Sequence, residues 1–295
     1  MTDLIIKKTQ FSLKLTPLLI SKVAALTCSL LVFNIGVANE RKLEDFKHSN
    51  FDENSINIDN KWWPLSPGKQ LIYDGETVED GKSIPHKIIF TVTDLTKVIN
   101  GVNTVVVWDR DFSKGKLEES ELAFFAQDKN GNVWHLGQYR EIYENEGLEL
   151  LGGRAWLANH LQGAKAGIMM HASPKLSKQS YSQGYAPPPF NWTDRARVIK
   201  TGQKTTVKAG SYKDVLVVEE YNEEEPNALQ LKYYAKGVGN VRVGWSGDDH
   251  SKETLELSKV VYLKNKDLAY VRKEAMKLEE RNYIYGHTQR AMRRD

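Results

Sequence analysis

Hydrophobic and polar residues alternate over short segments through most of this 295-residue chain, and such alternation is typical of β-strands with one buried face. The alternating segments fall into two blocks, residues 70–137 and 195–262. Turn signals that contain glycine separate neighbouring segments, at Asn100-Gly101, Lys114-Gly115 and 128–131. The pattern contains no strand–helix–strand alternation. We therefore predict a mainly β fold, built as a single large curved antiparallel sheet or an open barrel.

The segment between the two blocks has a different composition. Residues 145–192 contain several glycines, few β-branched residues and a proline run at 187–189 that forces an extended backbone. We predict that this segment is a long capping excursion over one mouth or face of the sheet, with a single helical turn at 154–158. Long ordered loops of this kind are often functional.

The hydrophobic period changes near the end of the chain. Leu268, Val271, Ala275 and Leu278 lie three or four residues apart, which places them on one face of a helix, and the other side of that helix is charged. The sequence therefore predicts a basic amphipathic C-terminal helix over 264–295, which docks along the sheet or extends into solvent.

Residues 1–38 have the pattern of an export signal. Four lysines precede an apolar run at 23–37, and the small residues at its end fit signal-peptidase cleavage after Ala38. The prediction is a periplasmic or secreted protein in which a flexible leader, 39–61, precedes a β domain, 62–263.

Two other interpretations of the N-terminus stay open. The first is an uncleaved membrane anchor, although the apolar run is shorter than the about 20 residues that a spanning helix needs. The second is a lipoprotein signal that is acylated at Cys28. Residues 25–27 match a lipobox poorly, because Thr27 stands where a small residue such as Gly or Ala normally precedes the cysteine.

Removal of residues 1–38 changes the composition in two ways. Cys28 is the only cysteine, so the mature chain has no disulfide, no thiolate metal site and no cysteine nucleophile. The signal also holds four of the 41 lysines and arginines and one of the 38 acidic residues, so the formal charge of +3 becomes zero. A neutral mature protein gives no basis for general nucleic-acid binding, which needs a basic patch.

The remaining charge is unevenly distributed. Residues 264–295 hold nine lysines and arginines against five acidic residues, a net charge of +4. This basic C-terminal helix could make a peripheral contact with an anionic membrane or bind an acidic partner. A solvated charged face is the alternative interpretation.

Two stretches of the chain carry a resemblance to a known group of proteins. The first runs from Trp108-Asp109-Arg110-Asp111 through the Asn-Gly hairpin at 124–134. The second combines the Gly210-Ser211-Tyr212 turn with the Tyr-Tyr-Ala-Lys-Gly-Val-Gly hairpin at 233–239. Together they resemble a widespread group of uncharacterised exported bacterial β-rich proteins that has no established reaction. The resemblance covers 62–262 and implies export and a curved antiparallel sheet, akin to half-barrels that carry lipids or lipoproteins across the periplasm.

Metal ligation in a cysteine-free chain would depend on histidine and carboxylate. The histidines include no pair at i, i+2 or i, i+4 spacing and no His-Glu-x-x-His motif. Met169-Met170-His171, with His160 eleven residues earlier, is the nearest approach to a cluster. Methionine and histidine bind copper, but methionine more often fills gaps in a core. We therefore predict no metal site and no cofactor.

Paired carboxylates are the remaining candidates for catalysis. Asp109 and Asp111 share one face of a predicted strand, and Glu119 and Glu121 share one face of the next. A glycosidase needs two carboxyl groups about 5–10 Å apart in a cleft. Alternating charge is also typical of a solvent-exposed strand face, and the sequence favours that interpretation. We therefore assign no catalytic residue.

Aromatic residues are the better candidates for ligand binding. The excursion contains several, in a segment where packing into a core is less demanding. They could line a mouth that accepts an apolar or amphiphilic ligand, or they could pin the long segment onto the sheet. These residues are Trp156, Tyr181, Tyr185, Phe190 and Trp192.

The sequence thus predicts an exported binding or carrier protein for an apolar or amphiphilic small molecule or lipid. One alternative is an exported hydrolase of polysaccharide or ester that uses the strand carboxylates. Another is a structural partner in envelope assembly that acts through the basic C-terminal helix.

Overall fold

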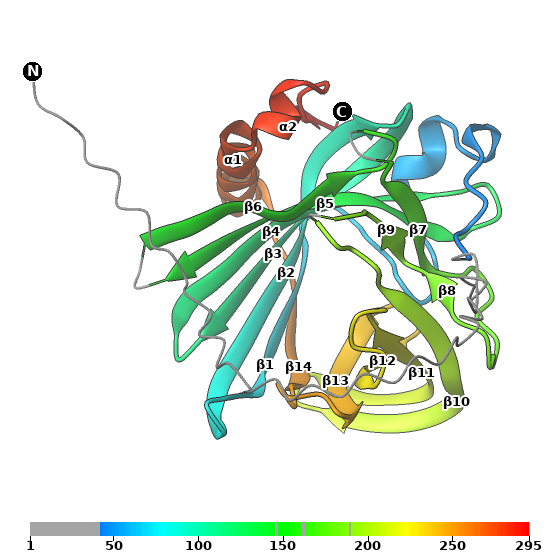
Figure 1. Cartoon of the computed structure of the whole chain (residues 1–295), viewed down its shortest axis with the longest axis vertical. Coiled ribbons are helices and arrows are strands. Elements are labelled where there is room, and N and C mark those ends of the chain that lie inside the picture. Colours follow the sequence, from blue (N-terminus) through cyan, green and yellow to red (C-terminus); the bar gives the residue numbers. More distant parts are fainter. Residues whose placement is uncertain (1–41, 145–146, 161–162, 189, 295) are drawn as a thin grey trace, which may run out of the picture. The chain divides into compact units, whose positions relative to one another are not determined.

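The computed structural model describes residues 42–144, 147–160, 163–188 and 190–294, and antiparallel strands make up most of this part (Figure 1). The signal peptide predicted for 1–38 and its cleavage site lie outside the described residues. The strands are β1 (Lys69–Glu79), β2 (Lys82–Ile99), β3 (Val102–Ser113), β4 (Lys116–Gln127), β5 (Val133–Glu144), β6 (Gly147–Leu157), β7 (Lys165–Met170), β8 (Tyr181–Ser182), β9 (Gly184–Tyr185), β10 (Arg195–Val207), β11 (Gly210–Tyr221), β12 (Ala228–Ala235), β13 (Gly239–Gly247), β14 (Thr254–Tyr262) and β15 (Met292–Arg293).

Tight glycine turns set the register of the first strands. Asn100-Gly101 joins β2 to β3 and Lys114-Gly115 joins β3 to β4, and in each turn both residues have positive φ. Two successive residues with positive φ form the type I′ turn that matches the twist of a hairpin. At the β4–β5 turn only Gly131 has positive φ, and the carboxylate of Asp128 accepts hydrogen bonds from the backbone N–H groups of Asn130 and Asn132 instead. The three predicted hairpins are therefore confirmed, although the third has different turn chemistry.

Two antiparallel meanders form the sheet. One has the order β1-β2-β3-β4-β5, the other has the order β10-β11-β12-β13-β14, and the pairing of β14 with β1 joins them. In Figure 1 the first meander fans out on one side and β10–β13 curve round opposite it. The mainly β fold with one large curved antiparallel sheet is confirmed, and the sheet is not closed into a barrel.

The segment predicted as an excursion supplies strands at both edges of this sheet. β6 and β7 both pair with β5, and β9 pairs with β7, whereas β8 pairs with β10. Only Gln183 separates β8 from β9, so the two edges of the sheet come together on either side of this residue. The helical turn predicted at 154–158 is wrong, because 154–157 lie in β6, where pairing with β5 satisfies the backbone.

The C-terminal helix packs against the sheet. Helix α1 (Asn265–Arg281) lies on β2 and β4, with Val271, Ala275 and Leu278 buried in the main core. The helix is shorter than the predicted 264–295: a short helix α2 (Tyr283–Gly286) follows, and β15 then pairs with β2. The helix is confirmed, and its predicted apolar face is the buried one.

The predicted flexible leader is packed against the domain over its described part. It contains the short 3-10 helices η1 (His48–Asn50) and η2 (Glu53–Ile56). Phe46 and Phe51 stack with ring centroids 5.0 Å apart, and both contact Trp134 on β5 edge to face. Aromatic contacts of this kind add to the free energy gained from burial, which explains why the segment is held on the sheet.

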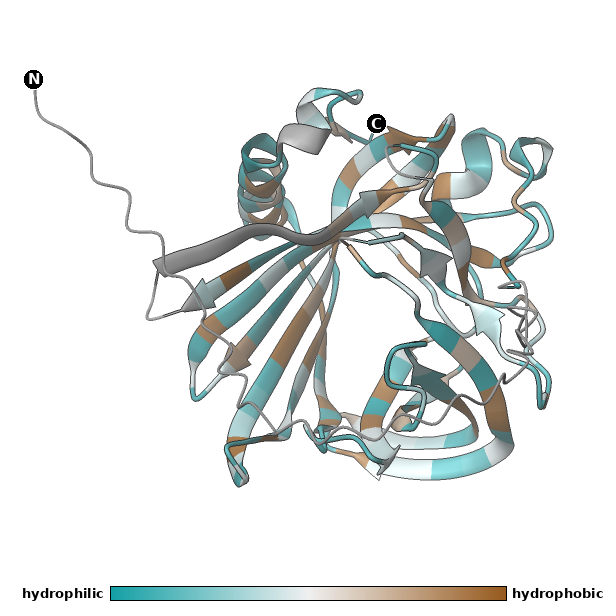
Figure 2. Cartoon of the chain, viewed as in Figure 1, coloured by the Kyte–Doolittle hydropathy of each residue, from teal (hydrophilic) through white to brown (hydrophobic). Residues whose placement is uncertain are grey.

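The main core lies where the first meander meets α1 and the leader. Val106, Phe124, Leu136 and Tyr139 are fully buried there. Figure 2 shows hydrophobic and hydrophilic residues in alternating bands along the strands. This alternation sends one set of side chains to each face of the sheet. The face enclosed by the curl carries the site described next.

Candidate functional site

A cavity of ≈ 390 Å³ lies on the concave face of the sheet, enclosed by strands of both meanders. Its lining comes from β1, β2, β3, β4, β5, β7, β11, β12, β13 and β14, and from the segments 63–65 and 183–194. The predicted excursion, 145–192, therefore does contribute to covering the interior, through Met169, Gln183 and Trp192. The volume lies within the range of small-molecule sites, about 300–1,000 Å³.

One wall of the cavity is apolar and aromatic. Trp63 lies at its centre, with its ring centroid 5.9 Å from that of Phe90 and 5.9 Å from that of Phe125. Leu71 and Leu255 extend this wall on the strands β1 and β14. Such a surface binds the apolar part of a ligand because its contact with water is costly.

The strand carboxyl groups adjoin this wall, because Asp109 on β3 is the cross-strand neighbour of Phe90 on β2. Asp109 and Asp111 on β3 and Glu119 and Glu121 on β4 all line the cavity. Residues two apart on a strand share a face, and the register pairs Asp109 with Glu121 and Asp111 with Glu119. The interpretation that these charges mark a solvent-exposed face is therefore wrong, because the curl of the sheet turns that face inward.

Burial changes the titration of three of these carboxyl groups. Burial raises the pKa of Asp109 to about 6. Burial, together with the neighbouring charge of Asp109, raises the pKa of Glu121 to about 8. Burial also raises the pKa of Asp111 to about 8, against the opposing effect of His86. The cavity wall therefore holds protons on carboxyl groups near neutral pH, because desolvation disfavours the charged form.

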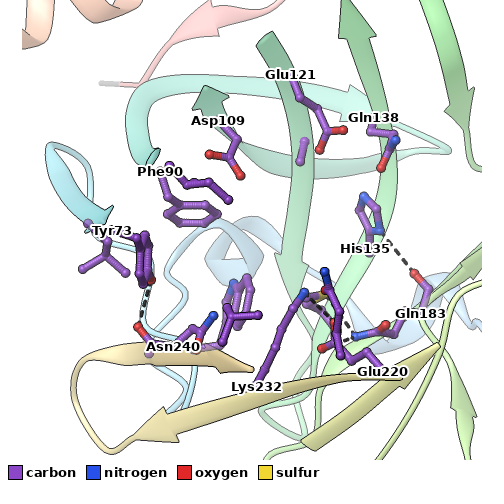
Figure 3. Close-up of a pocket in the computed structure, with 18 of the residues that line it drawn as sticks. Tyr73, Phe90, Asp109, Glu121, His135, Gln138, Gln183, Glu220, Lys232 and Asn240 are labelled. Atoms are coloured by element: carbon purple, nitrogen blue, oxygen red, sulfur yellow. Dashed lines mark hydrogen bonds and ion pairs between the residues drawn. The ribbon is translucent and has the colours of Figure 1, made fainter. Parts of the chain in front are cut away.

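Two other carboxylates in the cavity are neutralised by cations. Arg140 on β5 donates from Nη1 to both oxygens of Glu119, at 3.0 and 2.9 Å. Lys232 on β12 lies with Nζ 2.5 Å from Oε2 of Glu220 on β11. Glu220 also accepts a hydrogen bond from Gln183 Nε2 at 3.1 Å (Figure 3). These pairs fix the polar side chains at opposite sides of the cavity.

His86 holds a third set of charges next to the cavity. Its Nε2 lies 2.9 Å from Glu253 Oε1, and its Nδ1 lies 3.3 Å from Asp111 Oδ1. Burial lowers the pKa of His86, but the contact with Glu253 and the charge of Asp111 outweigh it and raise that pKa. His86 therefore lies between two carboxyl groups, Glu253 and Asp111, whose charges favour its protonated form.

His135 on β5 contributes a neutral acceptor to the cavity lining. Its Nδ1 donates to the backbone oxygen of Gln183 at 3.2 Å, which leaves Nε2 with a lone pair. That Nε2 is buried and has no hydrogen-bond partner among the described residues. Burial lowers the pKa of His135 to about 4, so the ring stays neutral at physiological pH. The amide oxygen of Gln138, also in the lining, is buried without a partner in the same part of the chain.

The structure brings two of the five predicted ligand-binding aromatics together beside His135. Trp192 lines the cavity, and Trp156 lies behind it with its ring centroid 6.0 Å from that of Trp192 and 5.0 Å from that of His135. A Cβ on Gly184 would lie 2.6 Å from the Trp156 ring, so this packing needs glycine there. Of the five predicted aromatics, Trp192 is thus the one that lines the cavity, and its role in binding a ligand stays a prediction.

The other three predicted aromatics do not line the cavity. Tyr181 is buried in β8 and contacts His171 edge to face, with ring centroids 4.5 Å apart. Tyr185 is half-buried in β9, and Phe190 packs against the main core. These contacts agree with the alternative that aromatics pin the segment onto the sheet.

The described residues hold no group of three or more histidine, cysteine or acidic side chains arranged to bind a metal. In the Met169-Met170-His171 sequence, Met169 lines the cavity, whereas Met170 is fully buried in the core. His171 instead contacts Tyr181. Within 42–144, 147–160, 163–188 and 190–294, no helix has the length and apolar character needed to cross a bilayer.

Sequence reasoning did not identify Gln138, Glu220 or Lys232 as cavity residues. For Glu220 a signal exists: Glu219-Glu220 follows a run of four buried aliphatic residues at 215–218, and acidic residues that continue a buried run need a specific partner. For Lys232 the sequence carries no such signal. Apolar and polar residues alternate around it in β12, as they do in a strand with one face in solvent.

No family model matches the chain, and no curated protein matches it. Two solved structures are similar to it. One is an inferred exported protein with a YmcC-like fold from Bacteroides fragilis, with 14% identity and a TM-score of 0.39. The other is an inferred lipoprotein from Parabacteroides distasonis, with 12% identity and a TM-score of 0.31. Each likeness covers 68% of this chain and 99% of the other.

The first is thus described as an exported protein and the second as a lipoprotein. At such identities and TM-scores, neither likeness carries a conclusion about the ligand, activity or location of this chain.

Proposed function

We propose that this protein works outside the cytoplasm as a binding or carrier protein for an amphiphilic ligand, which it holds in the interior cavity. The observation that carries the proposal is the division of the cavity into an apolar wall around Trp63, Phe90 and Phe125 and a carboxyl-bearing wall on β3 and β4. A ligand with one apolar and one polar part matches both walls, because each part then meets a surface of its own kind.

The location outside the cytoplasm is supported by the sequence of residues 1–38. The lysine-rich start, the apolar run and the small residues before Asn39 form the pattern that directs export. The absence of any cysteine after residue 38 means that the exported domain needs no disulfide, and the large core described above stabilises it alone.

The proposal is tested by native mass spectrometry and by titration with a fluorescent apolar probe such as N-phenyl-1-naphthylamine. We expect the purified protein to carry an extractable amphiphile or to bind the probe, with displacement by amphiphiles. Absence of both would overturn the proposal.

A matched pair of variants at Ala123 links binding to the cavity. Ala123 lines the cavity and is 5% exposed. Ala123→Leu adds volume to the cavity wall and is expected to weaken probe binding by about tenfold, a loss of 1.4 kcal/mol. Ala123→Ser keeps the size of the side chain and is expected to bind nearly as the parent does. Equal binding by both variants would place the probe elsewhere.

Hydrolysis of a glycoside or ester is a second candidate function, and one observation favours it. Asp109 and Glu121 oppose each other in a cavity, with pKa values raised to about 6 and about 8, so one carboxyl can be ionised while the other holds a proton. Turnover of a chromogenic glycoside or ester that is lost in Glu121→Gln would support it. Turnover that is equal in Glu121→Gln would exclude these carboxyls as catalytic residues.

A further inference from the structure

Two carboxyl side chains on neighbouring strands oppose each other in the cavity wall. Asp109 on β3 pairs with Glu121 on β4 in the antiparallel register. Figure 3 shows both side chains pointing into the cavity from the same side. Like charges at directly opposed positions destabilise a sheet. Wherever both carboxyls are ionised, this pair therefore costs stability in the protein alone, and a cation between them would relieve that cost.

The lysine and arginine that line the cavity already serve other carboxylates. Arg140 donates to both oxygens of Glu119, and Lys232 lies 2.5 Å from Glu220. Among the described lining residues these two are the only lysine or arginine side chains. Arg140 also faces Glu121 across β4 and β5, and the charges of Arg140 and Lys232 favour ionisation of Glu121 and Asp109. Among the described residues, however, neither cation forms an ion pair with Asp109 or Glu121. A cation in direct contact with the two carboxyls would therefore come with a bound molecule.

His135 is independent evidence that the ligand carries a hydrogen-bond donor. It is 4% exposed and lines the cavity, with Nδ1 committed to the carbonyl of Gln183. Its Nε2 is buried and accepts no hydrogen bond from any residue in the described part of the chain. A buried acceptor without a partner costs free energy that an N–H group of a ligand would recover. Figure 3 places His135 on the same side of the cavity as Glu121 and Gln138.

The aromatic wall is compatible with a positive charge in this space. The faces of Trp and Phe rings attract ammonium groups through the ring quadrupole, so Trp63, Phe90 and Phe125 offer a surface for both the cation and its apolar chain. An anionic head group would instead meet a wall that is rich in carboxyls.

We infer that the ligand of this cavity is a cationic amphiphile whose N–H-bearing ammonium group binds between Asp109 and Glu121 and donates a hydrogen bond to His135. The inference rests on the proposed function, since it names the chemical class of the ligand of the same cavity. The apolar chain of the ligand lies against the aromatic wall.

Three probes with the same ten-carbon chain test the inference: decylammonium, decanol and decanoate. Binding is measured by calorimetry or by displacement of the fluorescent probe, in slightly alkaline buffer where the two carboxyls ionise. We expect decylammonium to bind the wild-type protein at least about tenfold more tightly than decanol, which is the order of one charge-assisted hydrogen bond, and decanoate to bind weakest.

The variant Asp109→Asn/Glu121→Gln is expected to lose this preference and to keep its binding of decanol. Both substitutions are isosteric and neutral, so the fold is retained. The control Glu224→Gln/Asp248→Asn removes the same charge at exposed positions and is expected to keep the preference. Loss of the preference in the control as well would assign it to general charge and overturn the inference.

The outcomes separate the inference from the proposed function. Equal binding of all three probes, or tighter binding of decanoate, would overturn the cationic ligand and leave the binding function standing. Failure of every probe to bind would overturn both.

Discussion

Lys97 on β2 donates a hydrogen bond from Nζ to Oε1 of Glu279 on α1 at 2.9 Å, with side-chain exposures of 0% and 4%. The same Nζ donates to the backbone oxygen of Gln289 at 2.7 Å, and Glu279 Oε1 accepts from the backbone N–H of Ala291 at 2.7 Å. One buried ion pair thus joins the central sheet to the helix and to the chain that follows it.

Removal of either charge is expected to destabilise the protein. Lys97→Met leaves a buried carboxylate without its cation, and breaking a buried pair in this way costs about 3–5 kcal/mol. Urea unfolding, followed by far-ultraviolet circular dichroism, measures the change. The double variant Lys97→Met/Glu279→Gln removes both charges and keeps an acceptor for Ala291, so it should be more stable than Lys97→Met alone. A double variant that is less stable by the sum of the two single losses would show that the residues act independently.

The titration of Glu121 predicts how stability depends on pH. Its pKa is about 8 in the folded protein, against an ordinary value of 4.5, so between these values the unfolded chain binds fewer protons than the native one. Stability therefore falls as pH rises through this window, by about 1.4 kcal/mol per pH unit for this group.

The variant Glu121→Gln isolates this effect because it carries no titrating group. Its stability advantage over the wild type is expected to grow from pH 4.5 to about pH 8 and then to stay constant. Chemical denaturation at a series of pH values measures it, with the exposed Glu224→Gln as a control for the loss of a surface charge. A Glu121→Gln variant that is no more stable than the wild type at the alkaline end would contradict the burial argument.

Processing of the N-terminus gives a direct test of export. We expect the mature protein, isolated from the periplasm of a Gram-negative host, to begin at Asn39, because the small residues before it fit signal-peptidase cleavage. Intact mass and N-terminal sequencing measure this. Ala38→Lys should block cleavage and serve as the control. A start at Cys28 would indicate a lipoprotein, and retention of Met1 would indicate an anchor.

The strands and hairpins of this fold are readable in the sequence because they depend on local chemistry. Asn100-Gly101 and Lys114-Gly115 form turns that few other dipeptides allow, and they fix the register of the strands beside them. The pairing of β14 with β1 is not readable in this way. It joins residues such as Leu71 and Val260, which are far apart in the chain, and no local pattern encodes which distant strand will be the neighbour.

The candidate site could be predicted only in part for a related reason. Asp109 and Asp111 share one face of their strand, and that pattern is the same whether the face meets bulk water or a polar cavity. The choice between these is made by the curl of the sheet, whose edge strands β8 and β9 lie on either side of Gln183. Trp192 is a candidate because it falls in the excursion, where packing into a core is less demanding, and the structure places it in the cavity lining.

The C-terminal helix allows a last prediction, which concerns membranes. Its apolar face is buried on the sheet through Val271 and Leu278, so any membrane contact must use its charged side. Lys266 and Lys273 are exposed there, and Lys264 is exposed directly before the helix. Lysines near an anionic bilayer contribute about 1 kcal/mol each, so reversal of all three to glutamate should weaken binding to anionic vesicles by at least about 3 kcal/mol, or more than about 100-fold.

Co-sedimentation with vesicles of phosphatidylglycerol measures this binding, and it should weaken with added salt because the Debye length shortens. The triple variant Lys175→Glu/Lys178→Glu/Lys200→Glu, at exposed positions away from α1, makes the same change in net charge and serves as the control. Peripheral contact through α1 predicts that the helix variant loses binding and the control keeps it. Equal loss of vesicle binding in both variants would show that the attraction depends on the total charge of the protein. Absence of binding by the wild type would show that the charged face of α1 is only solvated.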